Sequence, residues 1–280
     1  MSHPFDRLLL ATEHSVYDGG AETLALALAR RCGQPLHAVL PVLSNPEFEM
    51  IAPQLAARAD AEAATKRQSL ETTASAQQVP LTVWVRHGPE PFESIVAAAQ
   101  ELGADLIVIR RRGQRGLLAN LLVGEMVGKV VAHAPCSVLI APRGAQMWRR
   151  GLLAGIDPLQ PVPAAVMQAA AIAAECTMPL HLLCVAESES ARPQAGQALA
   201  VALALARRTL PAAEGSVRLG RPHEQLTQLA RARGDDLLMV ARHGGHRLAR
   251  AWIGGTAQKV IGLAECPVLV HVQPPSKSEA

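Results

Sequence analysis

The sequence predicts an α/β protein of two tandem doubly wound domains, each with a five-stranded parallel sheet. Solidly apolar runs alternate with stretches of helical periodicity, which is typical of a parallel sheet that helices cover on both faces. The same succession then occurs a second time along the 280 residues. With 49% apolar residues, a chain of this length can bury two cores, and we expect domains at 1–146 and 147–280.

The duplication is visible as five pairs of blocks in the same order. RLLLATEHS, which contains Glu13, aligns with GLLAGIDPL, which contains Asp157, and CGQPLHAV aligns with CTMPLHLL at the same offset. Further along, VRHGPEPFESI pairs with VRLGRPHEQL, GADLIVIRRRG with GDDLLMVARHG, and GKVVAHAPCSVLIAP with QKVIGLAECPVLVHV. Because five matches in one order are difficult to obtain by chance, they indicate a tandem duplication.

Each copy is expected to alternate strands with helices and to end on its fifth strand. In the first copy we expect strands at 8–12, 36–42, 82–87, 105–110 and 137–142, with helices at 21–32 and 52–76. In the second we expect strands at 152–156, 180–186, 216–220, 236–241 and 267–272, with a helix at 196–210. Ligands of such sheets bind beyond the carboxyl ends of the strands, where the winding reverses. The loops after the first and fourth strands of each copy are therefore the expected sites.

Composition excludes several classes of function. A net charge of +3 without a basic stripe, together with 2% aromatic residues, gives no indication of a nucleic-acid partner. The chain shows no signal-peptide pattern and no apolar stretch near the roughly 20 residues that span a bilayer. The five cysteines form no CxxC pair and read as buried thiols of a reducing compartment. We therefore expect a cytoplasmic protein that has no contact with a membrane.

The second copy carries the strongest candidate site. Asp157 ends its first strand, and nine residues separate Gly244 from Gly254, Gly255 and Thr256, which open a helix. Glycines let the backbone approach phosphate oxygens, and a helix N-terminus attracts their charge. Asp157 would hold an adenine or ribose edge or, through a metal, phosphate oxygens. Alternatively, the glycines only shape the turn into the helix.

These motifs resemble those of the universal stress protein family, in particular its tandem two-domain members. ATP-binding members carry a glycine, two residues, a glycine, nine residues, a glycine and then serine or threonine; here Ala241 stands at the first glycine and Gly255 at the hydroxyl residue. The family's aspartate falls on Asp157, and HAPCSVLIAP resembles its fifth strand. The resemblance implies a stress role, a fold like that of adenine nucleotide alpha hydrolases, and an internal pseudo-dimer formed through the fifth strands. The site residues it implies are Ile156, Asp157, Val185, Ala241, His243, Gly244, Gly254, Gly255 and Thr256.

The first copy departs further from this pattern. Arg110 replaces the first glycine, ten residues separate Gly113 from Gly124, Glu125 replaces the hydroxyl residue, and Glu13 stands at the aspartate position. Two carboxylates facing a triphosphate are unfavourable unless the arginines at 110–112 pair with them, and such pairing would fill the pocket. We expect a degenerate nucleotide site that its own ion pairs close.

The sequence therefore predicts a stress-response regulator or scaffold that binds ATP or another adenine nucleotide, with Mg²⁺, in its second copy. A nucleotide-independent interaction protein with two vestigial sites is the alternative. We expect no catalysis beyond a weak ATPase, because no base or arginine finger adjoins the Gly254 loop. His243 and His246 lack a third ligand, so no metal site is expected. His37, His181, Cys136 and Cys266 are expected to have packing roles. The protein partner is not indicated, and a further homodimer is left open.

Overall fold

The computed structural model describes residues 4–13, 16–111, 124–242 and 253–273. They divide into two compact units, with Phe5–Arg111 and Glu125–Met147 in the first and the chain from Trp148 onward in the second. Each unit is an α/β domain with a parallel sheet, as the sequence predicts. The pseudo-dimer that the resemblance implies stays a prediction.

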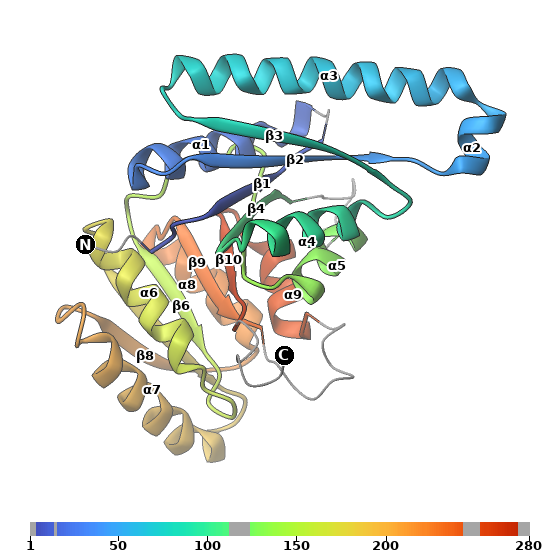
Figure 1. Ribbon diagram of the computed structural model, residues 1–280. Helices are drawn as coiled ribbons and strands as arrows, with labels where there is room; N and C mark the ends of the chain where they lie inside the picture. The colour runs from blue at the N-terminus through green and yellow to red at the C-terminus, as the bar shows by residue number, and fades with distance from the viewer. Residues whose placement is uncertain (1–3, 14–15, 112–123, 243–252, 274–280) are drawn as a thin grey trace. The chain divides into compact units, whose positions relative to one another are not determined.

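The first unit is wound outward from a central strand, β1. Its strands follow the order β3-β2-β1-β4-β5, and neighbouring strands are parallel (Figure 1). The chain adds β2 and β3 on one side of β1 and then β4 and β5 on the other, so the winding reverses between β1 and β4. The elements are β1 (Leu8–Ala11), α1 (Gly19–Cys32), β2 (Leu36–Leu43), α2 (Pro46–Ile51), α3 (Pro53–Ala76), β3 (Leu81–Gly88), α4 (Pro91–Leu102), β4 (Leu106–Arg110), α5 (Glu125–His133) and β5 (Ser137–Ala141).

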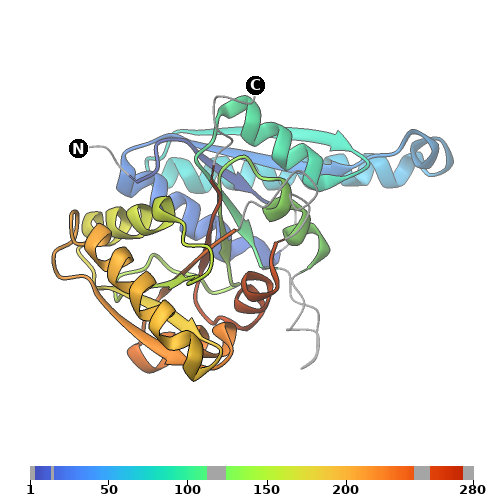
Figure 2. The ribbon, with the colours of Figure 1, turned by 90° about the horizontal axis from the view of Figure 1, so that it is seen from below.

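Helices cover both faces of this sheet. α1 and α3 pack on one face, and α4 and α5 pack on the other (Figures 1 and 2). Leu8, Leu9 and Leu10 of β1 are consequently fully buried, although their side chains alternate between the two faces. This explains why the strand is apolar at every position instead of at every second one.

Local signals set the ends of several helices. α3 and α4 begin with Pro53 and Pro91, where the missing N–H costs nothing, because the first-turn N–H groups have no partner inside the helix. α1 ends at Gly33, whose φ of 63° lies in the left-handed region that glycine adopts most easily. The short helix α2 was not predicted, because six residues are too few to show helical periodicity.

The second unit repeats this winding around β6. Its strand order is β10-β9-β6-β7-β8, and the neighbours are again parallel. Its elements are β6 (Leu152–Ile156), α6 (Pro163–Glu175), β7 (Leu180–Ala186), a 3₁₀ turn η3 (Glu189–Ala191), α7 (Arg192–Ala206), β8 (Glu214–Leu219), α8 (Pro222–Arg233), β9 (Leu237–Ala241), α9 (Gly255–Leu263) and β10 (Val268–His271).

The reversal of winding in the second unit falls between β6 and β9. Ala154 of β6 is in register with Leu182 of β7 on one side and with Met239 of β9 on the other. α6 and α7 pack together on one face of the sheet, and α8 and α9 pack together on the other (Figure 1). The crevice beyond the carboxyl ends of β6, β7 and β9 is therefore where a ligand of this fold binds.

Candidate functional site

A cavity of about 320 Å³ lies at that crevice of the second unit. Ligand pockets commonly have volumes of about 300–1,000 Å³, so this one is large enough for part of a nucleotide. Seven of the predicted site residues line it: Ile156, Asp157, Val185, Ala241, Gly254, Gly255 and Thr256. The other two, His243 and Gly244, lie outside the described residues. Segments from four parts of the chain therefore meet at one cavity.

Asp157 follows the last residue of β6 and is fixed by the turn that it begins. Its Oδ1 accepts hydrogen bonds from the backbone N–H groups of Leu159 (2.8 Å) and Gln160 (3.3 Å). This local bonding is typical of an aspartate that opens a turn. The turn holds the carboxylate at the cavity wall, which it forms together with Pro158 and Leu159.

The N-terminus of α9 forms another wall. Gly254 precedes the helix with φ of 81° and ψ of 134°, a conformation that a side chain would strain. Gly255 is the first helical residue, Thr256 is the second, and both are exposed. The first N–H groups of a helix have no partner within it and carry partial positive charge. This wall of the cavity is therefore suited to an anion.

The remaining wall is apolar. Val185, Val240 and Ile253 are each at least nine-tenths buried and border the cavity, together with Leu183, Ala186 and Leu226. Beneath this wall, the thiol of Cys184 donates a hydrogen bond to the carbonyl oxygen of Ile156 (3.4 Å), and burial raises its pKa to about 11. The thiol is therefore protonated and inert at neutral pH. A flat apolar group fits this side of the cavity.

Glu187 is a lining residue that the sequence reasoning missed. It is exposed and follows the last residue of β7, so the rule that ligands bind at carboxyl strand ends would have found it.

The glycine motif of the second unit can also be aligned one residue later along the chain. Nine residues separate Gly245 from Gly255, which puts Thr256 directly after the final glycine. The start of α9 at Gly255 agrees with this reading, although Gly245 lies outside the described residues.

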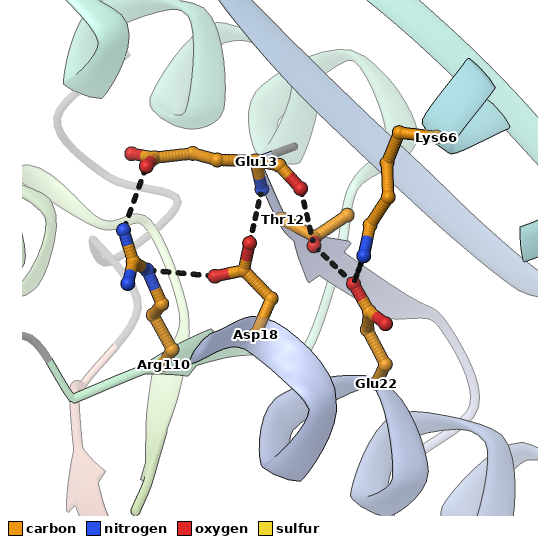
Figure 3. A network of polar contacts seen from close by, with 6 residues as sticks. All are labelled: Thr12, Glu13, Asp18, Glu22, Lys66 and Arg110. Carbon is orange, nitrogen blue, oxygen red and sulfur yellow. Dashed lines mark hydrogen bonds and ion pairs between the residues drawn. The ribbon is translucent and has the colours of Figure 1, made fainter. Parts of the chain in front are cut away.

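In the first unit, the equivalent place is held by a cluster of ion pairs (Figure 3). Arg110 ends β4 as Ala241 ends β9, and its side chain is only 11% exposed. Its Nη2 lies 2.8 Å from Oε2 of Glu13, and its Nε lies 2.6 Å from Oδ1 of Asp18. Asp18 is fully buried, and its Oδ2 accepts a hydrogen bond from the Glu13 N–H (3.2 Å).

Three further residues, Thr12, Glu22 and Lys66, continue this cluster. The hydroxyl of Thr12, which follows β1, donates to Oε1 of Glu22 (2.6 Å), and the same oxygen pairs with Nζ of Lys66 on α3 (Figure 3). The side chains of Glu22 and Lys66 are both less than one-fifth exposed. The carboxyl end of β1 is thus tied to α1 and α3 by charged groups of the chain itself.

The predicted ion pair between Glu13 and Arg110 is present, but the predicted role of Glu125 is wrong. The side chain of Glu125 is 83% exposed and pairs with Lys129 (3.0 Å). Glu125 opens α5, so the residue four positions later lies one turn along on the same helix face. Asp18 is the second carboxylate instead. Gly113 and Arg112 lie outside the described residues.

The histidines and cysteines singled out by the repeat have packing environments. The His37 ring contacts the Trp84 ring at a centroid distance of 5.4 Å, and Nε2 of His181 lies 2.8 Å from the Ser216 hydroxyl. Burial lowers the pKa of both histidines. None of the five cysteines forms a disulfide bond. Within the described ranges, no group of three or more His, Cys, Asp or Glu residues is arranged to hold a metal ion.

The fold and the cavity together define a tandem pair of doubly wound α/β domains, one of which has a ligand-type cavity at its switch point. The model of the Universal stress protein family matches residues 4–142 and 149–272. The chain therefore belongs to the universal stress protein family and carries two copies of its domain.

Comparisons with individual proteins agree with this assignment. The chain is 34% identical over 142 residues to a protein of Thermus aquaticus described as "Universal stress protein in QAH/OAS sulfhydrylase 3'region", with 49% of this chain and 98% of that protein covered. A universal stress protein of Archaeoglobus fulgidus superposes with a TM-score of 0.72 at 16% identity, covering 95% of this chain and 97% of that one.

Two further solved structures share the fold. A chain from Pseudomonas aeruginosa UCBPP-PA14 has a TM-score of 0.68 at 18% identity, with 95% of this chain and 93% of that chain covered. The cytoplasmic domain of a prokaryotic cation chloride cotransporter has a TM-score of 0.57 at 12% identity, with 96% of each chain covered. In the described part of this protein, none of the helices is long and apolar enough to cross a bilayer.

Proposed function

We propose that the second unit binds an adenine nucleotide, ATP in the first instance, and that the protein acts as a stress-response regulator or scaffold without catalysing a reaction. Membership of the family supports the stress role. The observation that carries the nucleotide proposal is the single cavity onto which Asp157, Val185, Ala241 and the Gly254–Thr256 turn converge.

The chemistry of the three walls fits the parts of a nucleotide. The apolar wall around Val185 and Ile253 suits a purine base, which is flat and weakly polar on its faces. Asp157 accepts hydrogen bonds and suits a ribose hydroxyl or the adenine amino group. The N-terminus of α9 suits phosphate oxygens. Asp157 and Glu187 both bring negative charge to the cavity, so we expect Mg²⁺ to accompany a triphosphate.

The first unit supports an asymmetric assignment. At the end of its fourth strand it carries Arg110, already paired with Glu13 and Asp18, where the second unit carries Ala241. An anion would have to separate ion pairs that are nearly out of contact with solvent. We therefore assign nucleotide binding to the second unit alone. The five cysteines, none of which forms a disulfide bond, and family membership support a cytoplasmic location, which we also propose.

The proposal can be tested by transplanting the arginine. Ala241→Arg places a guanidinium beside Asp157, the residue that aligns with Glu13. We expect isothermal titration of the purified chain with ATP and MgCl₂ to show one saturable site, and the variant to lose at least about tenfold in affinity, or about 1.4 kcal/mol. Ala241→Ser is the matched control and should keep the affinity. Thermal unfolding would confirm that both variants are folded.

Three results would contradict the proposal. If the wild-type chain showed neither ATP heat nor a thermal shift, and mass spectrometry found no co-purifying nucleotide, the nucleotide-independent interaction protein would be favoured. If replacing Gly113 by tryptophan lost as much affinity as replacing Gly244, the assignment to one unit would be wrong. Steady phosphate release that disappears in Asp157→Ala would instead indicate an enzyme.

A further inference from the structure

One end of the first unit exposes large apolar side chains close together in the chain. At the end of β2, in α2 and at the start of α3, Leu43 is 67% exposed, Met50 86%, Ile51 83% and Leu55 49%. Figure 1 shows α2 as the short turn of helix that joins β2 to the start of α3. Grouped exposure of this kind is uncommon on a protein surface without a binding role, since single exposed apolar residues are the norm.

An acidic cleft of about 550 Å³ is lined by Leu43 and by Glu49, the residue that precedes Met50 in α2. Oε1 of Glu49 accepts a hydrogen bond from the Ser44 hydroxyl, and Nε2 of His87 lies 2.7 Å from Oδ1 of Asp60. In the part of the chain that the structure describes, the second oxygen of each carboxylate has no assigned partner. The nearby cation Arg58 is paired with Glu62 (2.9 Å). The cleft is lined by Val42, Leu43, Ser44, Glu49, Pro53, Ala56, Asp60 and His87.

The second unit shows that the fold does not require this surface. At the same point of its winding, between β7 and α7, the chain runs Glu187, Ser188, Glu189 and Ser190, and all four residues are exposed. Water solvates such a segment at no cost. The first unit instead keeps a methionine and an isoleucine in water, which is unfavourable relative to burying their side chains. Covering these side chains with a partner would recover that free energy.

We propose that this end of the first unit is a docking surface for a protein segment that combines apolar side chains with lysine or arginine. Met50, Ile51, Leu43 and Leu55 would contact the apolar side chains, and Glu49 and Asp60 would receive the cation. The carboxylates favour this occupant over an anionic lipid surface, which they repel. They also favour it over a second copy of the surface, which would bring like charges together. The surface is separate from the proposed nucleotide site.

A displayed library of random 15-residue peptides can test the proposal on the full chain. Peptides are selected on the wild-type chain after depletion on the double variant Met50→Ser, Ile51→Ser, in which both substituted residues are exposed enough for the fold to persist. We expect the survivors to be enriched in apolar residues with lysine or arginine. The affinity of one survivor, measured by fluorescence anisotropy, should fall at least about tenfold in the double variant.

Separate variants test whether the carboxylates of Glu49 and Asp60 contribute to binding of the peptide. Glu49→Gln with Asp60→Asn should weaken the same peptide several-fold and reduce the salt dependence of its binding. Met167→Ser with Val201→Ser removes exposed apolar residues from the second unit and should leave binding unchanged.

Four outcomes would overturn the proposal. The first is a selection without survivors, or with survivors rich in glutamate and aspartate. The second is equal loss of binding in the second-unit control. The third is concentration-dependent dimerisation that Met50→Ser, Ile51→Ser abolishes, which would make a second copy the occupant. The fourth is co-sedimentation of the wild-type chain, but not that variant, with phosphatidylserine vesicles, which would indicate a membrane.

Discussion

The Nε atom of Arg110 lies 2.6 Å from Oδ1 of Asp18, a carboxylate that has no contact with solvent. The pair joins the end of β4 to the 3₁₀ turn Val16–Asp18 that precedes α1. Glu13 shares the same guanidinium at 2.8 Å. One cation therefore compensates two carboxylates at the carboxyl end of the first sheet.

Removing that cation should destabilise the first unit. Arg110→Met removes the guanidinium that pairs with Asp18 and Glu13 in a site nearly closed to water, which should lower the free energy of unfolding by about 3 kcal/mol. Arg58→Met is the control, since the Arg58 side chain is 75% exposed and its pairing with Glu62 should contribute less than about 1 kcal/mol. Urea unfolding measures both. Equal effects of the two variants would contradict the buried role of Arg110.

Gly254 should not tolerate a side chain. Its φ of 81° with ψ of 134° is strained for any other residue, so Gly254→Ala should cost about 1–3 kcal/mol and shift the start of α9. ATP affinity, if the proposed site is correct, should fall with it. Gly128→Ala lies inside α5 with open space for the methyl group and should instead stabilise the protein by about 0.5–1 kcal/mol. Thermal unfolding and isothermal titration separate the two effects, and destabilisation by both variants would disprove the conformational explanation.

Acid should destabilise the second unit through His271. Nδ1 of its ring lies 2.7 Å from Oε1 of Gln168, and burial lowers its pKa from 6.5 to about 4. The imidazole of His271 binds a proton more readily in the unfolded chain than in the folded one. The stability that the neutral, buried His271 contributes to the folded state is therefore fully present above pH 6.5 and is lost as the pH falls toward about 4. The loss should be about 3 kcal/mol.

The contribution of His271 can be isolated with a variant. In His271→Leu, the free energy of unfolding should decline less steeply between pH 6.5 and 4 than in the wild-type chain. His181 and His223 also have pKa values lowered by burial, so some decline should remain. Parallel curves for the variant and the wild-type chain would exclude His271 as the source.

Two thiols of the second unit should resist alkylation. Burial raises the pKa values of Cys184 and Cys266 to about 11, so almost no thiolate exists near neutral pH. Iodoacetamide should leave both residues unmodified in the native chain and modify both in guanidinium chloride, as peptide mass spectrometry can show. Rapid modification of native Cys184 would mean that the apolar wall of the cavity opens to solvent.

The sequence predicted the winding and much of the cavity because both follow from local rules. Strands buried on both faces are apolar throughout, and the rule that ligands bind at carboxyl strand ends located Asp157 and the Gly254–Thr256 turn. The ends of strands and helices are predicted less accurately than the order of the strands. For example, α7 begins at Arg192 and not at 196, because Pro193 suits the first turn of a helix and the apolar periodicity starts only after it.

The ion-pair cluster could be predicted only in part. Arg110 and Glu13 were found by alignment of the two copies, but nothing in the sequence distinguishes Asp18 from an exposed loop aspartate. Its burial depends on how the turn before α1 packs against β4. The alignment of the two copies places Glu125 in the cluster, but in the structure its carboxylate pairs with Lys129, one turn along α5. Which of several possible charged partners a carboxylate pairs with depends on distances in the folded chain, and the spacing of residues in the sequence does not determine those distances.

The guanidinium at the end of β4 differs from any soluble ligand in one respect: it cannot dissociate. Covalent attachment gives Arg110 an effective concentration beside Glu13 and Asp18 that no free cation in solution can reach. The turn Val16–Asp18 and the end of β4 therefore stay joined at every metabolite concentration, because this contact needs no ligand from solution.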